Sequence, residues 1–115
     1  MLRIVPNLRA RDPQALAAFY RDLFGLEIAM DMGWIATLAS DSPMKPQLSV
    51  MSEGGAGTEV PAISIEVDDV NGVHAAAQRG GHEIVHPLTD EEWGVRRFFV
   101  RDPEGHVVNV LSHPG

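Results

Sequence analysis

Apolar and polar residues follow one another in a pattern that predicts strands and helices in the same order twice. A first helix is predicted to begin after Asp12, with Pro13 at its first position, and to end at Gly25. Its apolar residues recur at helical spacing: Leu16, Phe19, Tyr20, Leu23 and Phe24. A weaker pattern predicts a second helix from Asp68 or Asp69 to Gly80. Strand-like runs fill most of the remainder, at about 2–8, 26–31, 34–39, 47–52, 62–67, 83–88, 95–101 and 106–112.

An internal repeat groups these elements into two halves. Gly25-Leu26-Glu27-Ile28 recurs as Gly81-His82-Glu83-Ile84, 56 residues later, and a glycine-rich linker, 52–58, lies between the halves. We therefore predict an α+β fold in one domain, 1–115, made of two tandem βαβββ modules, 1–52 and 60–115.

Strand alternation assigns two different faces to the predicted sheet. One face is uniformly apolar and is expected to lie under the helices: Ile4, Leu8, Leu48, Val50, Ile63, Ile65, Val67, Phe98, Val100, Val108 and Val110. The other face mixes apolar with hydrogen-bonding residues, among them Asn7, Gln47 and Ser64. Such a mixture favours a ligand cavity with a few orienting polar groups, and the alternative is a partly exposed or dimer-facing surface.

Composition and charge narrow the classes of partner. The 115 residues carry a net charge of −7, which argues against nucleic acid or an anionic membrane as a partner. The chain has no cysteine, so thiolate chemistry and disulfides are excluded. It shows neither a secretory leader nor a membrane-spanning run, and we expect a cytoplasmic protein.

Two motifs resemble those of the vicinal oxygen chelate superfamily, which includes glyoxalases, bleomycin-resistance proteins and extradiol dioxygenases. The segment 19–26, FYRDLFGL, is similar to the signature at the end of that family's first helix. The segment 97–106, RFFVRDPEGH, is similar to its last hairpin, where Asp102-Pro103-Glu104-Gly105 predicts the turn. The resemblance implies a curved mixed sheet with helices on the convex face, a ligand cavity on the concave face and a homodimer.

The resemblance also implies where metal ligands would stand. Carried over to this chain, the four positions fall on Val5, on Gln47 or Ser49, on Ala62 and on Asn109. Valine and alanine cannot coordinate a metal, and neutral amides are weak ligands for divalent transition metals. We therefore predict no metal and no other cofactor, and we interpret the five histidines as surface or structural residues.

The leading hypothesis is metal-independent binding of a small, partly aromatic molecule, as in drug-sequestering members of the family. The aromatic residues would stack on the ligand, Arg97 would pair with an anionic group, and the polar residues would set its orientation. The predicted ligand-binding residues are Asn7, Trp34, Gln47, Ser49, Ser64, Trp93, Arg97, Phe99 and Asn109. For both tryptophans, packing in the core or in a dimer remains the alternative.

Two other functions stay open. The chain could be a lyase or dioxygenase with a non-standard active site, or a metal-free catalyst that uses Glu66 or Arg97. As a base, Glu66 would have to be buried, and an exposed position at the end of its strand is the alternative. The chain could also be a component of a larger assembly that uses the open sheet as an interface.

Overall fold

The computed structural model describes residues 1–113, and the chain forms two compact units. We call Val5–Val60 the first module; the second module begins at Pro61 and also includes Met1–Ile4. Each module is described separately below.

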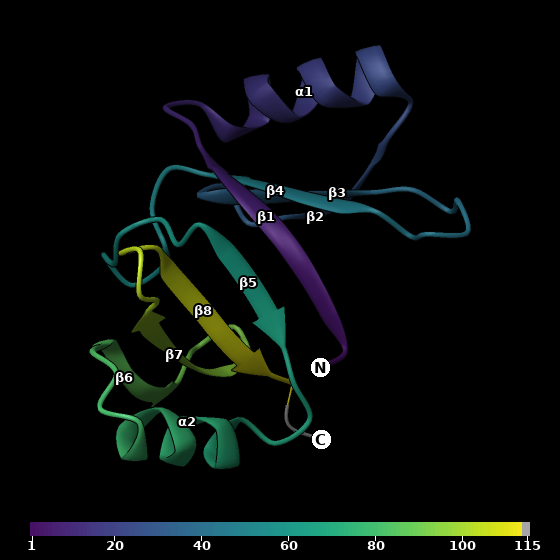
Figure 1. Ribbon diagram of the computed structural model, residues 1–115. Coiled ribbons are helices and arrows are strands. Elements are labelled where there is room, and N and C mark those ends of the chain that lie inside the picture. The colour runs from purple at the N-terminus through teal and green to yellow at the C-terminus, as the bar shows by residue number, and fades with distance from the viewer. Residues whose placement is uncertain (114–115) are drawn as a thin grey trace. The chain divides into compact units, whose positions relative to one another are not determined.

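The first module is a four-stranded mixed sheet with one helix (Figure 1). Its elements in chain order are β1 (Arg3–Arg9), α1 (Pro13–Phe24), β2 (Glu27–Asp31), β3 (Ile35–Ala39) and β4 (Gln47–Met51). The strand order is β2-β3-β4-β1, with β1 parallel to β4 and the other pairs antiparallel. Figure 1 shows α1 lying across one face of β3 and β4.

The second module repeats this arrangement. Its elements are β5 (Ile63–Glu66), α2 (Val70–Arg79), β6 (Ile84–Asp90), β7 (Arg96–Arg101) and β8 (Val107–Ser112). The strand order is β5-β8-β7-β6, with β5 parallel to β8 and the other pairs antiparallel. The α+β class and the repeated β-α-β-β-β order predicted from the sequence are therefore confirmed.

Side-chain caps fix where each helix begins. The Asp12 carboxylate accepts a hydrogen bond from the Ala15 N–H at 3.2 Å, and Gly25 ends α1 with a φ of 72°. In α2 the cap is Asp69, which accepts from the Gly72 N–H at 3.0 Å. A Cβ at Gly72 would lie 2.5 Å from an Asp69 carboxylate oxygen, so the glycine inside this helix leaves room for the cap.

Each module has its own apolar core on the side of its helix. In the first module Ala17 packs with Ala36, Leu38 and Val50, and in the second module Phe98 packs with Val67, Val70, Ala77 and Val110. The prediction that the apolar strand face lies under the helix is confirmed for the second module. It is wrong for two positions of β1, because Ile4 and Leu8 stay exposed.

The predicted apolar stripe of α1 is only partly buried. Leu16 and Tyr20 pack on the core, whereas Phe19, Leu23 and Phe24 are 53%, 62% and 63% exposed. Three large apolar side chains therefore face outward from the first module.

The predicted turn between β7 and β8 is present. The Gly105 N–H donates to the Asp102 carbonyl at 3.0 Å with a φ of 90° at Gly105, and the His106 N–H donates to the Asp102 carboxylate at 2.8 Å. Partial burial alone would raise the pKa of Asp102, but the hydrogen bonds from His106 and Glu104 outweigh it and lower the pKa. Within residues 1–113, no helix is long and apolar enough to cross a membrane.

Candidate functional site

The face of the second module's sheet opposite α2, here called the helix-free face, carries most of the predicted ligand-binding residues. Strand alternation sends Phe98 toward α2, where its ring lies 4.9 Å from the His74 ring. Its neighbours in β7, Arg97 and Phe99, therefore point to the helix-free face. Both are buried, although α2 lies on the other side.

Three neighbouring strands align polar and aromatic residues in one row on this face. Asn109 of β8 is in register with Ser64 of β5 on one side and with Phe99 of β7 on the other. The Asn109 amide donates to the Ser64 hydroxyl at 3.0 Å. Its carbonyl oxygen, Oδ1, is buried and has no hydrogen-bond partner within residues 1–113. The row thus contains an acceptor that a ligand N–H or O–H could satisfy.

Arg97 lies at the centre of an aromatic and acidic cluster. Its guanidinium carbon lies 4.9 Å from the centre of the Trp93 ring and 4.8 Å from the centre of the Phe99 ring. Its Nη2 donates to Glu91 Oε2 at 3.1 Å, and the two side chains are only 3% and 4% exposed. A buried cation and a buried anion are therefore paired beside two aromatic rings.

The same carboxylate contacts a histidine. The other oxygen of Glu91 lies 3.4 Å from Nε2 of His86, whose ring centre lies 5.3 Å from that of Phe99. Burial lowers the pKa of Arg97 below its ordinary value, and the adjacent Glu91 carboxylate opposes this shift. Arginine nevertheless stays protonated in proteins, so Arg97 is a buried cation with a buried counter-charge.

The four candidates of the first module lie near the strands to which the sequence assigned them. Asn7 of β1 is in register with Ser49 of β4, and both are buried. The Ser49 hydroxyl is hydrogen-bonded to the Thr37 hydroxyl at 2.8 Å. Gln47 begins β4, and Trp34 directly precedes β3, where its carbonyl accepts from the Ser52 N–H at 3.0 Å.

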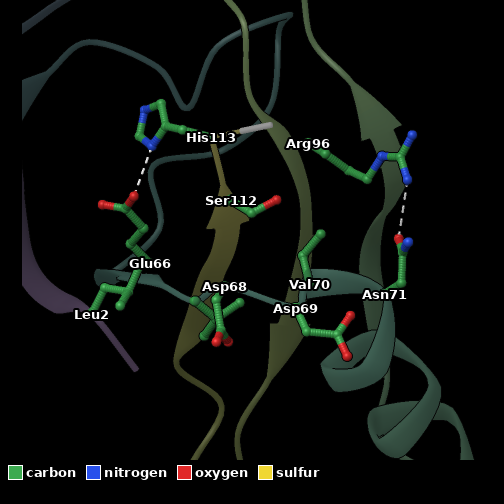
Figure 2. A pocket seen from close by; sticks show the side chains of 10 residues that line it. Leu2, Glu66, Asp68, Asp69, Val70, Asn71, Arg96, Ser112 and His113 are labelled. Atoms are coloured by element: carbon green, nitrogen blue, oxygen red, sulfur yellow. Dashed lines mark hydrogen bonds and ion pairs between the residues drawn. The ribbon is translucent and has the colours of Figure 1, made fainter. Parts of the chain in front are cut away.

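A pocket of about 450 Å³ opens elsewhere in the second module, where β5 and β8 end and α2 begins (Figure 2). None of the nine predicted ligand-binding residues lines it. Its lining consists of Leu2, Glu66, Val67, Asp68, Asp69, Val70, Asn71, Arg96, Ser112 and His113.

Glu66 lines this pocket and forms two ion-pair contacts. Its carboxylate accepts from Nε of Arg3 and lies 2.9 Å from Nδ1 of His113, and its side chain is 17% exposed. An exposed position at the strand end is therefore ruled out. Burial alone would raise the pKa of Glu66, but the hydrogen bonds from His113 and Arg3 outweigh it and lower the pKa.

Comparison with protein families assigns this arrangement to a known group. The family model of the Glyoxalase/Bleomycin resistance protein/Dioxygenase superfamily matches residues 3–110. The chain belongs to this superfamily. No curated protein matches the chain closely enough to serve as a relative.

Solved structures share the fold at low sequence identity. A Legionella pneumophila chain described as an NAD-dependent benzaldehyde dehydrogenase aligns with a TM-score of 0.81 at 15% identity, covering 97% of this chain and 100% of that chain. A superfamily member from Vibrio splendidus 12B01 aligns with a TM-score of 0.71 at 20% identity, covering 97% and 99%. A variant of Streptomyces coelicolor methylmalonyl-CoA epimerase, in complex with 2-nitronate-propionyl-CoA, aligns with a TM-score of 0.72 at 17% identity, covering 96% of each chain. These likenesses show the fold and leave the activity open.

The residues at the positions where the family resemblance would place metal ligands offer few donor atoms. Val5 and Ala62 have no donor atom in their side chains, and Asn109 offers only a neutral amide oxygen, which is a weak ligand for divalent transition metals. Over residues 1–113, no group of three or more His, Asp or Glu side chains is placed to hold a metal ion.

Sequence reasoning missed two members of the Arg97 cluster, Glu91 and His86. A signal for Glu91 was available in the hairpin that joins β6 and β7. Thr89 is in register with Arg97, so Glu91, two residues further on, lies on the same face and within diagonal reach of the guanidinium. His86 was interpreted as a surface residue, and the structure corrects this, because its side chain is 16% exposed and it contacts Glu91.

Proposed function

We propose that this chain binds a small, partly aromatic molecule, without a metal, on the helix-free face of its second module. The observation that carries the proposal is the group of Trp93, Arg97 and Phe99, in which a guanidinium lies over two rings. Of the two rings, only that of Trp93 is partly exposed, and a planar ligand stacked on it would gain about 0.5–1.5 kcal/mol beyond the area that it buries.

Asn109 would orient the ligand. Its buried Oδ1 has no hydrogen-bond partner within the described part of the chain, and a buried acceptor without a partner costs about 1–3 kcal/mol. A ligand N–H or O–H that reaches this oxygen would recover that cost. Asn7, Trp34, Gln47 and Ser49 of the first module remain predicted ligand-binding residues, and the proposal does not depend on them.

The role that suits these features is sequestration, as implied by the bleomycin-resistance members of the superfamily. The protein would hold an aromatic drug or metabolite and would not transform it. Metal-independent binding is supported by the donor atoms missing at Val5 and Ala62. We further propose that the protein is a homodimer, since members of the superfamily often are and since Phe19, Leu23 and Phe24 leave apolar surface uncovered on α1.

Intrinsic fluorescence provides a direct test, because the chain has only two tryptophans, Trp34 and Trp93. The variant Trp34→Phe leaves Trp93 as the single reporter, and Trp93→Phe is the matched control. Titration with a panel of aromatic antibiotics should change the emission of Trp34→Phe at saturable concentrations. No response in either variant across the panel would contradict the proposal.

The pocket at Glu66 supports a second candidate, a metal-free proton-transfer enzyme. The pKa of Glu66 is lowered, so its carboxylate is ionised at neutral pH; this makes it a weaker base but suits it to orient His113 beside the pocket. Methylmalonyl-CoA epimerase shares the fold and provides a concrete reaction to assay. Incorporation of solvent deuterium into methylmalonyl-CoA, lost in Glu66→Gln, would favour this candidate over sequestration.

A further inference from the structure

We infer that the ligand of the helix-free face is an uncharged aromatic molecule with a hydrogen-bond donor, and that Arg97 does not recognise an anionic group. This inference rests on the proposed function and specifies the class of ligand for the same site. It revises the role expected for Arg97 from sequence, which was to pair with an anion.

The first step concerns the charge of Arg97. Its guanidinium is bonded to the Glu91 carboxylate at 3.1 Å, and both side chains are almost fully buried. The charges of Arg97 and Glu91 sum to zero. A ligand carboxylate placed against Arg97 would also approach Glu91, and like charges brought together in an interface cost several kcal/mol.

The second step concerns the other charges that this face could offer. Arg101, two residues after Phe99 on the same strand face, lies 3.3 Å from a carboxylate oxygen of Glu83. Arg3 is paired with Glu66. Each of these three arginines therefore has a carboxylate beside it, and none supplies uncompensated positive charge to an anion.

The third step concerns what the site offers instead. The Arg97 guanidinium lies against the rings of Trp93 and Phe99, and the partly exposed ring of Trp93 is the surface on which a planar apolar ligand would stack. The Oδ1 of Asn109 accepts hydrogen bonds and repels carboxylate oxygens. An uncharged ring system with an N–H or O–H satisfies both features.

Three isosteric probes test this inference by calorimetric titration of the whole chain at pH 8, where histidine is ordinarily neutral. They are 2-naphthamide, which is neutral and has a donor, 2-acetonaphthone, which is neutral and has none, and 2-naphthoate, which is anionic. We expect 2-naphthamide to bind at least about tenfold more tightly than 2-naphthoate, because of the like-charge cost at Glu91. We expect the affinity for 2-acetonaphthone to be at least about fivefold lower than that for 2-naphthamide, because Asn109 Oδ1 then stays without a donor.

Variants separate the roles of the two charges. In Glu91→Gln, Arg97 loses its counter-charge, and we expect the affinity for 2-naphthoate to rise about tenfold or more while that for 2-naphthamide changes little. The double variant Glu91→Met/Arg97→Met removes both charges without leaving either one buried alone. Because the like-charge cost at Glu91 is then gone, it should show a smaller preference for 2-naphthamide over 2-naphthoate than the unaltered chain does, and it provides this test even if Glu91→Gln does not fold.

The outcomes distinguish this inference from the proposed function. The inference would be overturned, and the proposed function left intact, if the unaltered chain bound 2-naphthoate more tightly than the other two probes and the double variant did not. Equal binding of the amide and the ketone would overturn the part assigned to Asn109. Absence of binding by all three probes at millimolar concentration would overturn the proposed function and, with it, the inference.

Discussion

Removing the counter-charge of Arg97 should be among the most destabilising single changes in the second module. The Glu91 and Arg97 side chains are 4% and 3% exposed, so Glu91→Gln leaves a buried cation without an anion. Breaking a buried ion pair from one side costs about 3–5 kcal/mol, and glutamine keeps a hydrogen-bond acceptor. We therefore expect the lower end of that range, a loss of about 3 kcal/mol in the free energy of unfolding.

The loss is measurable by urea denaturation at 25 °C, followed by tryptophan fluorescence and far-ultraviolet circular dichroism. At about 4 °C per kcal/mol for a domain of this size, the Tm should fall by about 12 °C. The matched control is Glu92→Gln, an exposed neighbour in the same turn, which should change stability by less than about 0.5 kcal/mol.

A double variant completes the test. Replacing both partners by methionine removes the unpaired charge, so Glu91→Met/Arg97→Met should be clearly more stable than Glu91→Gln. The reasoning would be refuted if Glu91→Gln were no less stable than Glu92→Gln. In that case the contact between Glu91 and Arg97 would contribute nothing to the fold.

Three further outcomes follow from other parts of the molecule. The pKa values of Glu66 and Asp102 lie below their ordinary values of 4.5 and 3.8, so both carboxylates stabilise the fold above those values. That stability is lost as the pH falls through the lowered pKa values. In thermal melts the Tm should therefore decrease when the pH is brought below about 4.5, and this decrease should be smaller in Glu66→Gln. Asp12→Ala removes the cap of α1 and should cost about 1 kcal/mol in urea denaturation, whereas Asp12→Asn should cost little. Light scattering coupled to gel filtration should give the mass of a dimer, and Leu23→Lys should shift it toward the monomer if the exposed apolar surface of α1 lies in the interface.

The order and bounds of the elements could be predicted closely because local chemistry fixes them. Pro13 begins α1 and Gly25 ends it, and both act within a few residues of chain. The turn at Asp102 is likewise closed by hydrogen bonds within five residues, 102–106. None of these signals depends on what packs across the sheet.

The extent of burial could not be predicted in the same way. Helical spacing shows that Phe19, Leu23 and Phe24 share a side of α1 with Leu16 and Tyr20, but it does not show how much of that side has a partner. Strand alternation places Leu8 on the same face as Val50, yet Leu8 stays exposed. Burial depends on the neighbouring surface, which periodicity along one element does not describe.

The candidate site could be predicted only in part, and the reason is pairing register. Ser64, Phe99 and Asn109 lie side by side because their strands pair without interruption. The pairing of β6 with β7 shifts register twice, between Ile84 and His86 and again between His86 and Thr89. Simple alternation along β6 therefore does not show that His86 lies beside Glu91.

The central claim is that this member of the superfamily binds an aromatic molecule without a metal. The measurement that tests it most directly is the dissociation constant for 2-naphthamide, determined by calorimetry before and after exhaustive dialysis against EDTA. We expect saturable binding with the same dissociation constant in both samples. Binding that disappears after EDTA treatment and returns on addition of zinc or nickel would contradict the claim.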